Sequence, residues 1–166
     1  MNRPTLRGLC GLLAWLGLCG LPMACAQSAP ADARESASIS AITVERQCFG
    51  CPTGERLELV RDGRARLTRI GHARLGTVDQ VSEGPLQREE FDRLARAVQA
   101  AGYFSLSERY DDEGLQDGTW VLLTVVRSGV SRQVFRRENA GPKALADLLA
   151  TLDAARARIQ FLPLAR

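Results

Sequence analysis

Cys48 and Cys51, three residues apart, are the residues of this sequence whose types and spacing most clearly predict chemistry. Phe49 and Gly50 between them suit the centre of a type II turn, because the third residue of such a turn needs a positive φ that Gly supplies. That turn brings the flanking Cα atoms within about 7 Å, and a disulfide needs a separation of about 4.4 to 6.8 Å. We therefore predict a disulfide between Cys48 and Cys51.

The same spacing occurs in thiol-disulfide oxidoreductases, so a redox pair is the alternative interpretation. A redox pair of the thioredoxin type lies at a helix N-terminus within a βαβ unit. Here Pro52 disfavours a helical conformation for Cys51, and a strand pattern follows at Leu57. The sequence therefore favours a structural disulfide. A metal site is less favoured, because no second cysteine pair or ligand-spaced histidine completes one.

Three further residues, His72, Asp117 and Trp120, are candidate binding residues with weaker signals. His72 is the only histidine, and no nucleophile-elbow motif accompanies it to support a catalytic triad. The acidic loop from Asp111 to Asp117 lacks the alternating ligands of a calcium-binding EF-hand, which favours a solvated turn. Trp120 and other aromatic residues could line a ligand groove, although such residues are more often part of a core. We expect no catalytic residue, no metal and no cofactor.

The N-terminus has the features of a signal peptide. Arg3 and Arg7 precede an apolar run at residues 8–21, and Met23-Ala24-Cys25-Ala26 supplies a small-x-small cleavage pattern. We expect residues 1–26 to be removed and the protein to be periplasmic or secreted. The apolar run is shorter than the about 20 residues that span a bilayer.

Lipidation of Cys25 is the alternative to ordinary cleavage. Residues 21–25 resemble a lipoprotein cleavage box, in which Cys25 is acylated and anchors the chain to the bacterial membrane. Pro22 stands where that box usually carries Leu, which favours ordinary cleavage after Ala26. Contact with a membrane is expected only if Cys25 is lipidated.

The remainder divides into a linker and one domain. Residues 27–38 are rich in Ala, Ser and Pro and predict a flexible linker, whereas residues 39–166 are long enough for a single domain with its own core. Without residues 1–26 the chain has 20 basic and 19 acidic residues, and every basic residue except Lys143 is Arg. This near-neutral balance, without a clustered basic face, argues against a nucleic-acid partner.

Hydrophobic periodicity predicts an α+β domain. Strand patterns are marked by Ile42 and Val44, by Leu57 and Leu59, by Ala65 and Leu67, ambiguously by residues 78–81, and by residues 120–126 and 130–136. Helices are predicted from Gln87 to Ala101 and from Pro142 to Ile159. The order β-β-β-(β)-α-β-β-α with tight turns predicts an antiparallel sheet of about five to six strands carrying two amphipathic helices on one face.

Several local details follow from side-chain pairing and capping patterns. A three-residue loop ending at Gly63 places apolar side chains opposite one another, which predicts a bulged hairpin with Gly63 left-handed. Glu90 is predicted to close a capping box at the first helix, and Gly102 to end that helix. Residues 120–126 are apolar on both faces, which predicts a strand in the middle of the sheet. The register of the hairpin after Ser128 and Gly129 stays open.

Six motifs are spread along the domain: Cys48-Phe49-Gly50-Cys51-Pro52, Asp62-Gly63, Glu89-Glu90-Phe91, Tyr103-Phe104-Ser105-Leu106, Asp117-Gly118-Thr119 and Asn139-Ala140-Gly141-Pro142. Together they resemble a family of bacterial envelope proteins and lipoproteins known only as a domain of unknown function. Members of the family usually have one more residue between the cysteines, so the bridge geometry need not be shared. The resemblance covers residues 39–159 and implies export and one compact domain, with no activity or catalytic residue.

The sequence therefore favours an exported, non-catalytic binding or accessory domain of the bacterial cell envelope, with an unknown envelope protein or small ligand as its partner. The alternative is a thiol-disulfide redox protein or sensor that uses Cys48 and Cys51. Whether the chain is an enzyme stays open, and no feature nominates a substrate.

Overall fold

The structure of the chain is a computed structural model that describes residues 35–36, 38–111, 114 and 118–164. The strands are β1 (Ile39–Cys48), β2 (Gly54–Val60), β3 (Arg64–Ile70), β4 (Gln80–Pro85), β5 (Arg109–Tyr110), β6 (Thr119–Arg127), β7 (Val130–Arg137) and β8 (Leu162–Pro163). The helices are α2 (Arg88–Ala100) and α3 (Lys143–Arg158), with short 3-10 turns η1 (Ala73–Leu75) and η2 (Tyr103–Ser105). The predicted signal peptide, Cys25 and most of the linker lie outside the described residues and stay predictions.

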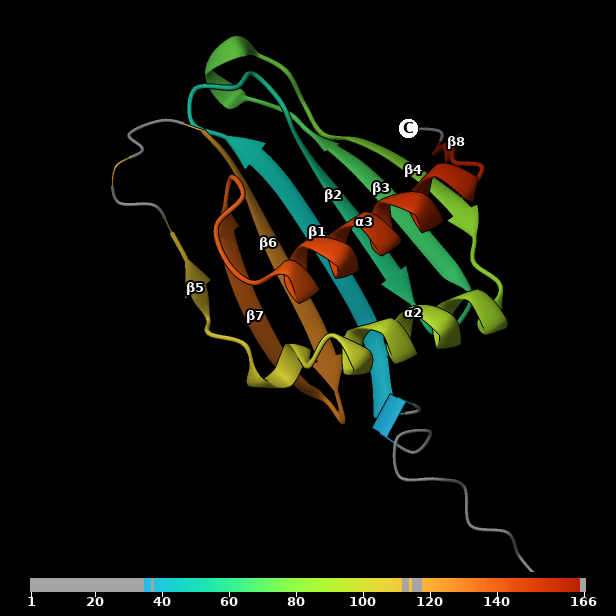
Figure 1. Cartoon of the computed structure of the whole chain (residues 1–166). Coiled ribbons are helices and arrows are strands. Elements are labelled where there is room, and N and C mark those ends of the chain that lie inside the picture. The colour runs from blue at the N-terminus through green and yellow to red at the C-terminus, as the bar shows by residue number, and fades with distance from the viewer. Residues whose placement is uncertain (1–34, 37, 112–113, 115–117, 165–166) are drawn as a thin grey trace, which may run out of the picture.

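The strands described form one eight-stranded sheet in the order β5-β7-β6-β1-β2-β3-β4-β8. Neighbouring strands are antiparallel except β5 and β7, which are parallel. Both helices cross the same face of the sheet (Figure 1). The predicted α+β class is therefore confirmed. We call the face that α2 and α3 leave uncovered the open face.

The core lies between the helices and the covered face. Strand side chains alternate between the two faces, so every second residue of β1, β2 and β6 points toward α2 and α3. The core side chains come from all layers: Ile39, Ile42, Val44, Leu57, Leu59, Ala65, Leu86, Phe91, Leu94, Ala95, Val98, Tyr103, Leu123, Val125, Val134, Leu145, Leu148, Leu149, Leu152 and Ala155. Burial of a large apolar side chain stabilises the fold by roughly 1.5–3 kcal/mol, which explains why both helices dock on this face.

The predicted number of strands was wrong, because the part of the chain described here has eight rather than five to six. The two missed strands, β5 and β8, have two residues each, which is too short for any hydrophobic periodicity. The ambiguous strand at residues 78–81 is instead β4. The parallel pairing of β5 with β7 was not anticipated either.

The β2–β3 and β6–β7 hairpins both have registers set by turn residues with positive φ. The first has the predicted three-residue loop, with Leu59 opposite Ala65 and Gly63 at a φ of +100°. In the second, Arg127 pairs with Val130 around a two-residue turn in which Ser128 has a φ of 51° and Gly129 a φ of 80°. Positive φ at both central residues matches the twist of the flanking strands, which resolves the open register.

Helix α2 buries Phe91, Leu94, Ala95 and Val98 but does not have the predicted capping box. Gln87 is the N-cap residue and makes no side-chain capping hydrogen bond. The carboxylate of Glu90 instead accepts a hydrogen bond of 2.6 Å from Arg158 of α3 and pairs with Arg93. Each oxygen of this carboxylate thus contacts one guanidinium group rather than the N-cap. Gly102 follows the helix with a φ of 63°, as predicted.

Tyr103 ties η2 to the central strands. Its ring is fully buried, and its hydroxyl lies 2.7 Å from the carbonyl oxygen of Leu123 and 2.8 Å from that of Arg132, to which it can donate. Burial of the phenol raises the pKa of Tyr103 above its ordinary value, because the charged phenolate would lose its hydration. This contact fixes the segment that leads into β5 against the β6–β7 hairpin.

Candidate functional site

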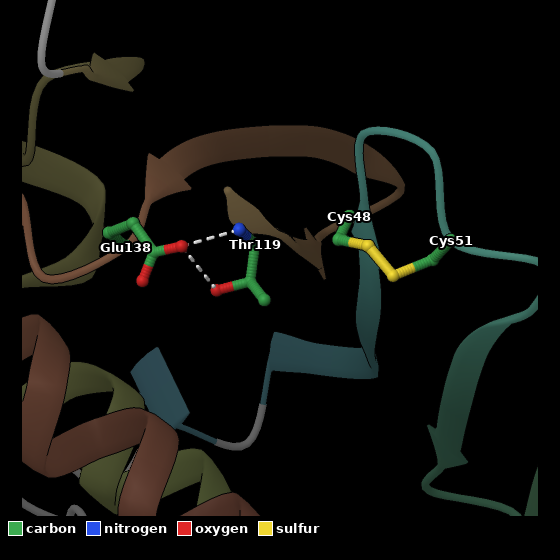
Figure 2. The surroundings of a disulfide bond; sticks show 4 residues. All are labelled: Cys48, Cys51, Thr119 and Glu138. Carbon is green, nitrogen blue, oxygen red and sulfur yellow. Dashed lines mark hydrogen bonds between the residues drawn. A yellow bond between two sulfur atoms is a disulfide. The ribbon is translucent and has the colours of Figure 1, made fainter. Parts of the chain in front are cut away.

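The cysteine pair forms the predicted disulfide at the end of β1 (Figure 2). The Cα atoms of Cys48 and Cys51 are 5.3 Å apart, and the Cys51 amide donates to the Cys48 carbonyl at 3.4 Å. Gly50 has a φ of 82°, which is the left-handed conformation that the turn requires. The bond closes a tight turn between β1 and β2, and it does not lie at the start of a helix.

One hydrogen bond holds this turn next to the start of β6, and a second contact joins the start of β6 to the end of β7. The Phe49 amide donates to the Gly118 carbonyl at 3.3 Å. The next residue, Thr119, donates from its amide at 2.5 Å and from its hydroxyl at 3.1 Å to the carboxylate of Glu138, which follows β7 (Figure 2). The disulfide turn, the start of β6 and the end of β7 therefore form one connected corner of the sheet.

A cleft of about 490 Å³ lies beside the disulfide. Its lining residues are Arg46, Gln47, Cys48, Cys51, Thr53, Gly54, Glu55, Arg69, Thr119, Trp120 and Val121. Arg46 pairs with Asp153 of α3 at 2.9 Å, whereas Arg69 is exposed at the rim. The disulfide is thus reachable from solvent through a cleft that it shares with Arg46, Arg69 and Glu55.

On the open face, the turn continues into what we call the aromatic–arginine row: Phe49, Arg137, Trp120, Phe135 and Arg109. The Arg137 guanidinium lies 4.9 Å from the centroid of the Phe49 ring, and that of Arg109 lies 4.5 Å from the centroid of Phe135. The rings of Trp120 and Phe135 are 6.0 Å apart. Such cation–π and ring contacts are individually worth about 0.5–1.5 kcal/mol.

Asp111 links the two arginines of the row. Its carboxylate lies 3.0 Å from Nε of Arg137 and accepts a 3.0 Å hydrogen bond from Nε of Arg109. The side chains of Asp111 and Arg137 are only 19% and 13% exposed, so water screens this pair less than a surface ion pair. Strand β5 is consequently fixed to the end of β7.

The row shares Trp120 and Phe135 with what we call the apolar strip of the open face. Trp120, Leu122 and Val126 of β6 and Phe135 of β7 are half-buried there, whereas Leu123 and Val125 on the covered face are fully buried. β6 does lie in the middle of the sheet, as its sequence predicted. Only one of its two apolar faces is covered by the described residues.

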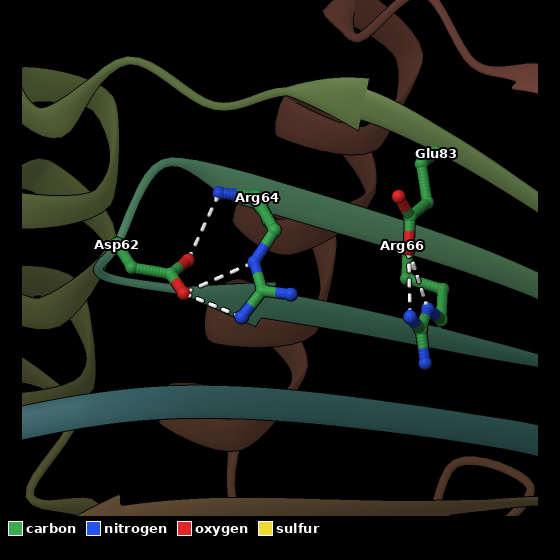
Figure 3. A network of polar contacts seen from close by, with 4 residues as sticks. All are labelled: Asp62, Arg64, Arg66 and Glu83. Carbon is green, nitrogen blue, oxygen red and sulfur yellow. Dashed lines mark hydrogen bonds and ion pairs between the residues drawn. The ribbon is translucent and has the colours of Figure 1, made fainter.

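The other half of the open face, formed by β2, β3 and β4, is charged and internally paired. Arg66 donates to the Glu83 carboxylate at 2.7 and 2.9 Å, and Arg64 donates to Asp62 at 2.6 Å (Figure 3). The hydrogen bond from Arg64 lowers the pKa of the Asp62 carboxyl group below its ordinary value. These paired charges suit contact with water, so the apolar strip differs from its surroundings.

Of the three candidate binding residues, the structure describes Trp120 and His72, which lie on different elements. Trp120 lies in the row and beside the disulfide cleft. His72 lies on the loop after β3, where its Nδ1 atom is buried without a hydrogen-bond partner among the described residues. Asp117 lies outside the described residues. No group of three His, Cys, Asp or Glu side chains suited to a metal ion is found in the described part of the chain.

Sequence reasoning missed Arg109, Asp111 and Arg137. Asp111 was assigned to a solvated turn, because nothing in an acidic loop distinguishes the carboxylate that turns inward. Arg109 and Arg137 belong to a chain in which almost every basic residue is Arg, so their type carried no signal. Only the pairing of β5 with β7 identifies them.

Comparison with known proteins adds no identity to this geometry. No protein-family model matches the sequence, and no curated protein matches it significantly. The resemblance to an envelope family therefore stays a prediction. Across the described residues, no helix combines the length and apolarity needed to cross a membrane.

Proposed function

We propose that this chain is an exported, non-catalytic binding domain of the bacterial cell envelope that contacts a partner protein through the apolar strip and the aromatic–arginine row. The observation that carries the proposal is the strip itself, in which Trp120, Leu122, Val126 and Phe135 stand on a sheet face without a covering layer in the described residues. An antiparallel sheet with one solvated face normally alternates apolar and polar residues. A partner that covers the strip would account for the departure.

The side chains of the row are held in place before any partner arrives. Asp111 connects Arg109 and Arg137, and the disulfide turn positions Phe49 next to Arg137. Phe49 is 47% exposed and Arg109 is 61% exposed in its side chain, so both present contact area to solvent. Aromatic and Arg side chains fixed in this way lose little conformational entropy on binding and are typical of interface hot spots.

The N-terminal segment enters the domain away from the row. The Ser128 amide in the β6–β7 turn donates to the Ser38 carbonyl at 3.0 Å, so the chain enters the domain at the end opposite the disulfide turn (Figure 1). A linker anchored at a lipidated Cys25 would therefore leave the disulfide end and the row pointing away from the membrane. The same arrangement serves a freely periplasmic protein.

Site-specific photo-crosslinking in the source bacterium tests the binding surface. A benzophenone amino acid replaces Leu122 in the strip, and the matched control carries it at Thr151, which is exposed on α3. We expect a discrete adduct with one envelope protein from Leu122 only, and its loss when Phe135→Asp is added. No adduct at Leu122, or the same adduct from both positions, would contradict the proposal.

Mass spectrometry of the natively produced protein tests export separately. With and without thiol alkylation, the mass reports the mature N-terminus, an acyl chain on Cys25 and the disulfide together. A reduced chain that retains residues 1–26 would refute export.

A thiol-disulfide redox protein or sensor is the second candidate, because Cys48 and Cys51 line an open cleft together with Arg46 and Arg69. Arginine near a thiol favours the reactive thiolate. The reduction potential of the Cys48–Cys51 pair distinguishes a redox role from a structural one. A value below about −300 mV, typical of structural disulfides, would refute the redox role, whereas a value near −200 mV would support it.

A further inference from the structure

The outer edge of β7 is only half paired. β6 pairs with β7 along its whole length, but on the other side β5 pairs only with Phe135 and Arg136. The Phe135 amide donates to the Glu108 carbonyl at 2.8 Å, so this amide points away from β6. Main-chain groups alternate in direction along an antiparallel strand, so the N–H and C=O groups of Ser131 and Gln133 also point outward. No described strand pairs with them.

The opposite edge of the sheet is protected against pairing with another chain, whereas the outer edge of β7 is not. There the last strand is β8, a two-residue strand that contains Pro163 and so lacks one main-chain donor. Short strands, proline and outward charges are the usual means by which edges avoid pairing with other chains. The stretch from Val130 to Gln133 has no proline, and the guanidinium of Arg132 turns aside to donate to the Leu106 carbonyl at 2.5 Å.

A cleft of about 710 Å³ lies along this free stretch. Its lining residues are Phe104, Glu108, Leu122, Arg127, Val130, Ser131, Arg132, Gln133 and Phe135. Two of these are cationic and one is anionic; Arg127 also lies 4.0 Å from the Glu35 carboxylate, so the positive charge of the cleft is centred on Arg132. The Nε atom of Arg132 is buried without a hydrogen-bond partner in the described part of the chain. The Arg127 guanidinium rests 3.6 Å from the centroid of the Phe104 ring.

We propose that an extended acidic segment of the partner protein adds to the sheet at Ser131 and Gln133, as a strand beside the first half of β7. The main-chain groups of these two residues supply up to four hydrogen bonds, and strand alternation sends guest side chains to both faces. Acidic side chains on the helix side would face Arg127 and Arg132. Apolar side chains on the open side would extend the strip next to Phe135. The inference rests on the proposed function, because the guest strand enlarges the same binding surface.

A synthetic peptide tests the inference without knowledge of the partner. The probe is acetyl-Thr-Val-Glu-Val-Glu-Val-Thr-amide, and its control carries Lys in place of both Glu residues. Titration is followed by amide NMR on the full mature chain. We expect saturable binding of the acidic peptide below 1 mM, slowed amide exchange at Ser131 and Gln133, and at least fivefold weaker binding of the basic peptide.

The edge is tested by Gln133→Pro, with Gln133→Ala as the matched control. Proline removes an N–H that points away from β6, together with the side-chain hydrogen bond of 3.3 Å from Gln133 to the Thr124 hydroxyl, so the β6–β7 hairpin keeps its main-chain hydrogen bonds. Alanine removes the same side chain but retains that N–H. We expect at least fivefold weaker peptide binding for the proline variant and less than a twofold change for alanine. Ser131→Pro repeats the test at the second outward amide if Gln133→Pro lowers the melting temperature by more than a few degrees.

The inference is overturned if the acidic peptide does not bind, if both peptides bind equally, or if proline at either position leaves binding unchanged. It is also overturned if sedimentation shows a dimer of the free chain that Gln133→Pro dissociates, because a second copy would then be the occupant. The crosslink from Leu122 distinguishes the two proposals. If the crosslink persists while the peptide test fails, the added strand is refuted and the proposed binding surface is retained.

Discussion

Removal of the disulfide by Cys48→Ser with Cys51→Ser gives a prediction whose magnitude follows from the size of the closed loop. A loop of four residues lowers the entropy of the unfolded chain by an amount equal to about 2 kcal/mol at 25 °C. For a domain of about 130 residues, 1 kcal/mol shifts the melting temperature by about 3–5 °C. We expect the oxidised wild type to melt about 6–10 °C above the double variant in a calorimetric scan at pH 7.

The loss of stability in the double variant should also be local to the disulfide turn. The bond closes one turn, which is held to β6 by the 3.3 Å hydrogen bond from Phe49 to Gly118, while the core strands are held by burial. We expect amide exchange to accelerate by an order of magnitude or more at Phe49 and Cys51 and to follow only the global change at Val44. Wild type in reductant is the control, and it should match the double variant. A melting temperature within 2 °C of the wild type, or equal acceleration at Val44, would refute the description of the bond as a loop staple.

Three further predictions concern the fold that carries the site. Tyr103→Phe should cost about 1 kcal/mol at pH 7. Because burial raises the pKa of Tyr103, this phenol ionises at lower pH in the unfolded chain than in the folded one, and wild-type stability should fall above about pH 10. The Tyr103→Phe variant should lack this decline. Urea unfolding midpoints at pH 7 and pH 11 measure the difference. Gly63→Val should cost about 1–2 kcal/mol because Gly63 has a φ of +100°, and an unchanged melting temperature would contradict the hairpin register. Phe91→Ala should cost about 3–5 kcal/mol in urea unfolding, and a loss below about 1 kcal/mol would place Phe91 outside the core.

The parts of the fold that local patterns encode could be predicted from the sequence. The loop ending at Gly63 was determined by which apolar residues face each other across the hairpin. The buried stripe of α2 followed from helical spacing, and its end followed from Gly102. In each case a few neighbouring residues contain both the signal and its physical cause, so no tertiary contact was needed.

The rest of the candidate site depends on contacts between distant segments. Asp111 is fixed by Arg109 and Arg137, and Phe49 meets Arg137 only because β1 and β7 both border β6. Strand β5 has two residues and therefore no period to detect. The disulfide could be predicted from the sequence because its geometry is local. The aromatic–arginine row, which the disulfide turn helps to build, could not.

The disulfide and the binding surface meet at one side chain, which makes their roles separable. Phe49 lies between the two cysteines and contacts Arg137 of the row, whereas the strip at Leu122 lies two residues farther along β6 than Trp120. If the bond is a structural staple, the Cys48→Ser, Cys51→Ser variant loses stability but keeps the crosslink from Leu122. If the bond is a redox centre, the variant stays as stable as the oxidised wild type and any envelope phenotype is lost although the crosslink persists. A variant that loses the crosslink while its core remains folded would mean that the turn itself is part of the interface, with Phe49 as its contact residue.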